Sequence, residues 1–397
     1  MRKNSLCLTM ATIFCAFALT GCQKVPDATT ENNIMHAQGD VEKQVQDIVI
    51  VDTQEQTQVK QVVGQYQGIV GTGDNTISIN AEVPALPDEL YIITLKPNDG
   101  LDKNTLLTFL DSESSNIEDT SQELLKEIEE SDKYNVTPDE TGERVLYSKF
   151  GDHSAMRLGD GKKEASFACH TSAYYVDNDL MEKYYGIYSG AYSETLIIQD
   201  QMDKGSFSAN EAAKILLDKV EAVGVSDIAI KKIHCTEGAG HSFYNIEFVP
   251  VYDGIVVDIG SNSYALGQVW PNGYALISEE GVAELSLIDF CGKSVDKKSV
   301  TALSFEQVLK ILEQYLDSGI IESDGKITYN RVELNYYPVP NPAPVMDEIE
   351  YKSELVLTPI WHIYMPLDEY VDGGYGDAVG PSHICVNAVT GELEGAD

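Results

Sequence analysis

Residues 207–224, FSANEAAKILLDKVEAVG, and residues 303–319, LSFEQVLKILEQYLDSG, decide the predicted fold of the chain. Each stretch has a serine followed three residues later by Glu or Gln, which predicts a capping box at a helix N-terminus. Each ends at a glycine, Gly224 or Gly319, where a helix C-cap often uses one. Each helix is expected to have one apolar stripe. The stripe consists of Ala212, Leu216 and Val220 in the first helix, and of Val308, Leu312 and Tyr315 in the second.

The two helices share more than their caps. The tripeptide Lys-Ile-Leu occurs at 214–216 and again at 310–312, and all the matched positions are offset by 96 residues. Strand-like runs follow each helix, at 227–235 and 243–259 in the first case and at 326–339, 355–366 and 382–393 in the second. This shared order predicts a duplicated unit over residues 201–298 and 299–397, each with a helix across an antiparallel sheet.

The preceding region also mixes strands and helices. Alternating runs at 76–86 (TISINAEVPAL) and 89–97 (ELYIITLKP) predict strands, and 120–131 (TSQELLKEIEES) predicts a capped helix. Further strand-like runs lie at 144–150 and 165–176. The predicted fold class is therefore α+β, with an N-terminal α+β domain over 66–200 followed by the two repeated helix-on-antiparallel-sheet units.

The second unit resembles the helix-plus-antiparallel-strand modules of the PepSY and YycI/YycH type. The resemblance rests on residues 304–316, on LTPIWHIYM at 357–365 and on the hairpin CVNAVTGEL at 385–393. It implies a membrane sensor kinase as partner, although YycI and YycH are held by an N-terminal membrane helix. Most of the chain is also similar to a family of uncharacterised lipoproteins of Gram-positive anaerobes, through INAEVPALPDEL (79–90) and TPIWHIY (358–364). That family carries no assigned activity.

The N-terminus predicts a lipoprotein. Arg2 and Lys3 precede an uncharged apolar run that is short for a membrane span and typical of a secretory signal core. Leu19-Thr20-Gly21-Cys22 then resembles the bacterial lipobox, in which the thiol takes a diacylglyceryl group. We expect residues 1–21 to be a signal peptide, Cys22 to carry lipid on the extracytoplasmic face of the cell membrane, and residues 22–65, which are polar, to be a disordered tether. An ordinary cleaved signal peptide or an uncleaved anchor are the alternatives.

Charge restricts the class of partner. Removal of the leader takes away two basic residues and no acidic one, so 25 basic side chains remain against 64 acidic ones and the formal charge becomes −39. A field this negative repels nucleic acid and other polyanions, which argues against a DNA- or RNA-binding role. The membrane is therefore contacted through the lipid.

No set of residues with a recognisable chemistry stands out. Four cysteines remain beyond Cys22, at positions 169, 235, 291 and 385, and they allow two disulfides or four buried thiols. No C-x-x-C, H-E-x-x-H, G-x-S-x-G or phosphate-loop motif occurs. The sequence therefore predicts no catalytic, cofactor or metal residues. The chain has 22 tyrosines, with clusters at 173–192 and 334–342, a composition that suits recognition surfaces and half-buried strands alike.

Two functions are consistent with these features. The first is a non-catalytic binding or regulatory protein of the cell envelope, with a sensor kinase, protease or wall enzyme as partner. The second is an extracytoplasmic hydrolase that acts on glycan or peptide through carboxylates the sequence does not identify. The repeated unit and the missing catalytic motif favour the first, so we expect no enzymatic activity.

We predict that Cys22→Ala abolishes lipid attachment, because the thiol is the only group at the lipobox that can form the thioether. Metabolic labelling with a clickable fatty acid measures this directly in the expressed chain. Label of wild-type strength in the variant would contradict the assignment, and Cys7→Ala, in the leader, is the matched control that should keep the label.

Overall fold

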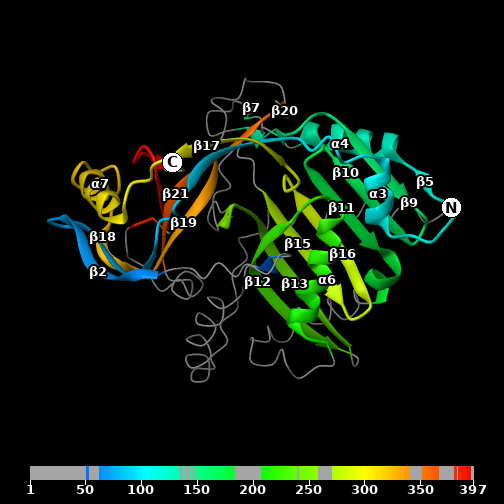
Figure 1. Ribbon diagram of the computed structural model, residues 1–397, viewed down its shortest axis with the longest axis horizontal. Helices are drawn as coiled ribbons and strands as arrows, with labels where there is room; N and C mark the ends of the chain where they lie inside the picture. Colours follow the sequence, from blue (N-terminus) through cyan, green and yellow to red (C-terminus); the bar gives the residue numbers. More distant parts are fainter. Residues whose placement is uncertain are drawn as a thin grey trace. The chain divides into compact units, whose positions relative to one another are not determined.

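A computed structural model gives the structure of the chain (Figure 1). All of the described residues belong to one compact unit, Val41–Asp397. The described residues are 51–52, 62–134, 137–138, 144–145, 149–183, 207–238, 241–257, 271–339, 351–365, 380–381 and 383–394. The predicted signal peptide, Cys22 and most of the predicted tether lie outside them. No helix in these ranges is long and apolar enough to cross a membrane.

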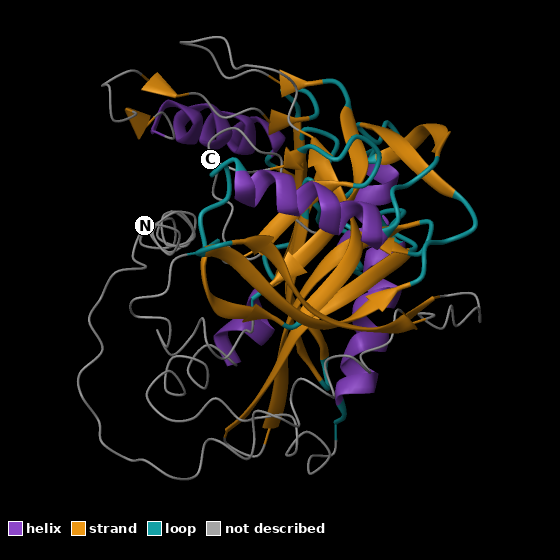
Figure 2. Cartoon of the chain, turned by 90° about the vertical axis from the view of Figure 1, so that its left-hand side faces the viewer, coloured by secondary structure: helices purple, strands orange, loops and turns teal. Residues whose placement is uncertain are grey.

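The predicted fold class is wrong, because strands dominate the structure. Twenty-three strands and only four helices are assigned over the described residues, and the strands form three large sheets (Figure 2). The predicted pair of self-contained helix-on-sheet units is not present. The helices do pack on sheets, but strands from distant parts of the chain complete those sheets.

The largest sheet has ten strands, and all of its neighbouring strands are antiparallel. Along the sheet they are β1 (Val51–Asp52), β12 (Asp227–Gly238), β13 (His241–Tyr252), β15 (Asn272–Ser278), β16 (Gly281–Ile288), β11 (Ser172–Asp177), β10 (Lys163–Ala168), β9 (Ala155–Gly159) and β5 (Glu118–Asp119), with β14 (Ile255–Val256) beside β13. The pairing of β11 with β16 crosses the boundary predicted at residue 200.

Helices cover the two faces of this sheet differently. On one face α3 (Lys103–Leu110) and α6 (Ala209–Glu221) bury their apolar sides (Figure 1). Phe109, Leu216 and Leu158 of β9 belong to the same core. The neighbouring strand residue Arg157 points the other way, because side chains alternate along a strand. There its guanidinium meets Glu127 of α4 (Ser121–Tyr134) at 2.8 Å.

The second and third sheets surround the remaining long helix, α7 (Phe305–Asp317). The six-stranded sheet contains β17 (Lys293–Val300), β4 (Leu90–Lys96), β21 (Leu355–Tyr364), β22 (His383–Asn387), β23 (Leu393–Glu394) and β19 (Arg331–Val339). The three-stranded sheet contains β18 (Asp324–Tyr329), β3 (Asn75–Pro84) and β2 (Val62–Thr72), and β18 runs parallel to β3. Two short pairs are β20 (Tyr351–Lys352) with β8 (Lys149–Phe150), and β6 (Thr137–Pro138) with β7 (Arg144–Val145).

Local predictions for the two matched helices are confirmed. Both capping boxes form, Ser208 with Glu211 and Ser304 with Gln307. The predicted stripe residues of α6 are all buried, as are Val308 and Leu312 of α7, while Tyr315 is half-buried.

The duplication itself is wrong. After α6 the strands β12, β13, β15 and β16 follow in chain order as neighbours in one sheet. After α7, β18 leaves to pair with β3, and β19 pairs with β21 in a different sheet. A cap and an apolar stripe are local signals, whereas the partner of a strand is chosen by contacts far along the chain. The two units therefore share a helix design without sharing a topology.

The hairpin between β22 and β23 forms as its sequence predicts. The Asn387 side-chain oxygen accepts hydrogen bonds from the backbone N–H groups of Val389 and Thr390 at 2.9 and 3.0 Å. Gly391 has φ 81°, a left-handed conformation that a glycine adopts without strain. The turn fixes where β22 ends and where β23 returns along it.

We predict that Leu312→Ala lowers the free energy of unfolding by about 2–5 kcal/mol, because this fully buried side chain would leave a cavity under α7. Denaturant unfolding of the whole chain measures it. Lys310→Ala on the exposed side of the same helix is the control and should cost little. Equal losses for the two variants would mean that α7 does not face the core in this way.

Candidate functional site

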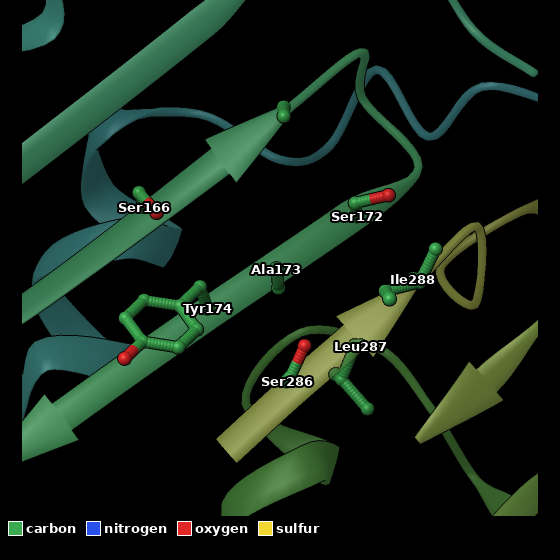
Figure 3. Close-up of a pocket in the computed structure, with 8 residues that line it drawn as sticks. Ser166, Ser172, Ala173, Tyr174, Ser286, Leu287 and Ile288 are labelled. Atoms are coloured by element: carbon green, nitrogen blue, oxygen red, sulfur yellow. The ribbon is translucent and has the colours of Figure 1, made fainter. Parts of the chain in front are cut away.

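A recess lies on the face of the ten-stranded sheet opposite α3 and α6. It has a volume of about 190 Å³, and Figure 3 shows it across β10, β11 and β16. Its lining consists of Ser166, Ala168, Ser172, Ala173, Tyr174, Ser286, Leu287 and Ile288. We call this the Ser–Tyr recess. Ser166, Tyr174 and Ser286 share one row across the three strands, so strand register alone brings them together.

Two carboxyl groups follow in the next row of the same face. Glu164 of β10 and Glu284 of β16 both pair with Val176 of β11, so two strand spacings separate them, about 10 Å between Cα atoms. Burial raises the pKa of both carboxyls above its usual range. The Tyr174 hydroxyl donates to Glu284 at 3.2 Å and opposes the shift there, while the charge of Arg157 opposes it at Glu164. This hydrogen bond therefore links Glu284 to Tyr174, which lines the recess.

A serine, a histidine and an aspartate also meet, at the start of β9. The Ser154 hydroxyl lies 3.1 Å from Nδ1 of His170, and both carboxylate oxygens of Asp152 lie 3.1 Å from the same nitrogen. Ser154 also donates to Asp152. In a hydrolytic triad the serine and the aspartate contact opposite nitrogens of the imidazole, so that one nitrogen accepts the serine proton while the aspartate orients the ring and stabilises the imidazolium. Here both contact one nitrogen, and the arrangement does not activate the serine.

A third group lies on the six-stranded sheet and combines two imidazoles with a thiol. In the register of β21 with β22, His362 is opposite Cys385 and Tyr364 is opposite His383. Strand alternation places all four on one face. Ligand atoms of His362, His383 and Cys385 lie within 4.8 Å of one another. His362 and Cys385 are buried and His383 is half-buried. Among the described residues, this is the group of side chains that could hold a metal ion.

This group is not predicted from the sequence, although two signals of it are present there. His383 and Cys385 form an H-x-C pair, which places both side chains on one face if the segment is a strand. His362 stands in the strand-like run at 357–365. The pairing register of the two strands, which no local pattern supplies, was the missing information.

Other residues with possible functional chemistry are dispersed. Cys22, His36, Trp270 and the acidic segment 368–378 lie outside the described residues. Trp361 is buried in the core. His153 contacts Glu129 at 3.2 Å. Cys169, Cys235, Cys291 and Cys385 are all buried, and the disulfide alternative is not realised among them.

Comparisons with known proteins leave the function open. No known protein family matches the sequence, and no curated protein matches it. The structure is similar to the crystal structure of an uncharacterized protein from Eubacterium rectale ATCC 33656, with a TM-score of 0.43 and 13% sequence identity over 89% of this chain and 98% of that one. At this level of similarity neither fold nor function is carried over.

Lys219 of α6 is a buried cation at the apolar face of the ten-stranded sheet. Its ammonium lies 3.5 Å from the centroid of the Tyr175 ring and donates to the carbonyl of Phe109, near the end of α3. Burial nevertheless lowers the pKa of Lys219 to about 8. The folded state therefore releases this proton at a lower pH than the unfolded state does.

We predict that the free energy of unfolding rises between pH 8 and about 10.5 because of Lys219, since the unfolded chain binds the extra proton over that interval. The gain is at most about 3 kcal/mol, the equivalent of the pKa difference. The Lys219→Met variant should lack this rise, whereas Lys214→Met, which changes an exposed lysine of the same helix, should keep it. Parallel pH profiles for wild type and Lys219→Met would refute the assignment.

Proposed function

We propose that the chain is a non-catalytic binding protein of the cell envelope, held to the membrane through lipid on Cys22, and that it contacts its partner at the Ser–Tyr recess. The observation that supports this is the recess itself, a small concave site with three hydroxyl-bearing serines and a tyrosine on a rigid sheet. Tyrosine and serine together give contact area and adaptable hydrogen bonds at low entropy cost. The proposal does not depend on the duplicated unit, which the fold excludes.

The surroundings of the recess suit a partner with polar, uncharged or basic groups. Ile288, at one end, is 43% exposed and supplies an apolar contact. Beyond Tyr174, Glu284 and Glu164 stand in the next row, and the chain as a whole is strongly acidic. An anionic partner would be repelled by this field. An envelope protein, such as a sensor kinase, protease or wall enzyme, would present suitable polar loops.

Hydrolysis is the second candidate, and one observation favours it. Two carboxyls with raised pKa on one sheet face are the groups that an acid–base glycosidase needs, with one protonated as the acid. The separation of about 10 Å between Cα atoms is compatible with a pair that leaves room for a water. In this case the recess would bind substrate next to the carboxyls.

One experiment tests the binding role. A photo-crosslinking amino acid is placed at Ile288 in the full chain, in intact cells, and adducts are identified by mass spectrometry. Val295 of β17, which is 48% exposed, is the matched control position. We expect an adduct from position 288 only, and its loss when Ser286→Trp fills the recess. Equal adducts from both positions, or an adduct that survives Ser286→Trp, would overturn the proposal.

Glutamine variants of the two carboxyl residues separate binding from hydrolysis. Under the binding proposal, Glu284→Gln keeps the adduct from position 288, because the amide retains the size of the carboxyl. If the chain is a hydrolase, Glu284→Gln or Glu164→Gln should abolish turnover of wall glycan or peptide while the adduct persists. Turnover that both variants retain would remove the carboxyls from consideration.

A further inference from the structure

The geometry points to a metal-binding site on the six-stranded sheet, formed by His362, His383 and Cys385, that takes a late transition-metal ion of the Zn²⁺ class. This site is independent of the Ser–Tyr recess, since the two lie on different sheets. It would give the protein a ligand that its composition does not suggest.

Backbone pairing brings the three ligands together. His362 is opposite Cys385 in the antiparallel register, and His383 is two residues from Cys385 on the same face of β22. Their ligand atoms lie within 4.8 Å of one another. Tetrahedral zinc has bonds of about 2.0–2.3 Å, which place ligand atoms about 3.3–3.7 Å apart. Side-chain rotations that move the ligand atoms by about 1 Å, without movement of the strands, would bring them to the spacing of a bound zinc ion.

The donor set selects the class of metal. Two imidazole nitrogens and a thiolate favour Zn²⁺, Co²⁺ and copper over Ca²⁺ and Mg²⁺, which require oxygen ligands. Three protein ligands also leave a fourth position for water or an exogenous group. Because His362 and Cys385 are buried whereas His383 is half-buried, that position is reached from the His383 side.

Neighbouring side chains hold the imidazole of His362 in place. The Tyr364 ring stacks on it with centroids 3.6 Å apart, and the Tyr364 hydroxyl accepts from Nδ2 of Asn335 at 2.9 Å. Glu333 of β19 stands opposite His362 in the register. A carboxylate in this position is the usual outer partner of a metal-bound histidine, where it orients the ring.

One nearby charge must be accounted for. The Arg331 guanidinium lies 3.8 Å from the centroid of the Tyr364 ring, on the same face of the sheet. Its Nε is 3.5 Å from Glu333, so the two charges offset each other. A metal ion here would be bound by the Cys385 sulfur as a thiolate, because thiol ligands lose their proton when they bind metal.

The experiment titrates metal into the chain from residue 22 onward, with Cys22→Ser as the common background so that the unlipidated thiol of Cys22 does not contribute. Co²⁺ is the spectroscopic probe, because a thiolate ligand gives a charge-transfer absorption band, and Zn²⁺ affinity is measured by competition with a chromophoric chelator. We expect one equivalent of metal, displacement of Co²⁺ by Zn²⁺, and a rise in Tm on binding.

Matched variants decide whether this site is the ligand set. Cys385→Ser should abolish the charge-transfer band, whereas Cys235→Ser, at another buried cysteine, should leave it unchanged. His383→Gln, at a half-buried position that tolerates substitution, should weaken Zn²⁺ binding at least tenfold and keeps the test valid if Cys385→Ser fails to fold. Less than one equivalent bound by the background protein, or a band that persists in folded Cys385→Ser, would overturn the inference, as would wild-type affinity in His383→Gln.

Discussion

Strand β21 is the element on which the second sheet depends, because it is hydrogen-bonded to three other strands and buried along nearly its whole length. β19 pairs with it on one side for nine residues, while β4 and β22 share its other side. A strand in this position has no solvent-facing side. Every residue of β21 therefore contacts protein on one face or the other, and the alternation of its side chains divides the surroundings into two environments.

The two environments differ in chemistry. Trp361 and Ile363 point toward α7, where Trp361 stacks near Phe305 and donates from its indole nitrogen to the carbonyl of Leu303. His362 and Tyr364, one residue away, point to the opposite face among Arg331 and Glu333 of β19. A shift of one residue in the register of β21 would turn the polar side chains of His362 and Tyr364 under the helix. The apolar core on one face thus fixes the positions of the polar side chains on the other.

The sequence predicted the local structure and missed the pairing, for a physical reason. Caps, apolar stripes and the turn at Asn387–Gly391 are decided by residues within a few positions of each other, and these predictions were confirmed. The parallel pairing of β18 with β3 joins segments about 250 residues apart. The Asn75 side chain even donates to carbonyls at Leu316 and Ile321, beside the end of α7. No periodicity in the sequence encodes such contacts, so the helix-strand order was mistaken for a repeat.

The two candidate sites could not be predicted from the sequence for the same reason, because both depend on strand pairing. Ser166, Tyr174 and Ser286 are ordinary strand residues until β11 pairs with β10 and β16, and the H-x-C pair of β22 acquires a third partner only through β21. Composition and motif searches examine neighbours in sequence, whereas both groups are built from neighbours in a sheet. Only the polar side chains at alternate positions of β19, β21 and β22 indicate that one face of the six-stranded sheet has a role other than packing.

Stability alone does not explain that polar face. Burying imidazole and thiol groups stabilises a sheet less than burying Val or Ile does, as the opposite face of β22 illustrates with Ile384 and Val386. His362 is completely buried in the middle of the most constrained strand of its sheet, where an apolar residue of similar size would add stability. A bound metal ion would offset this loss of stability, because it binds the folded state only. It would raise the free energy of unfolding by RT ln(1 + [M]/Kd). The arrangement is thus better explained by a ligand than by packing.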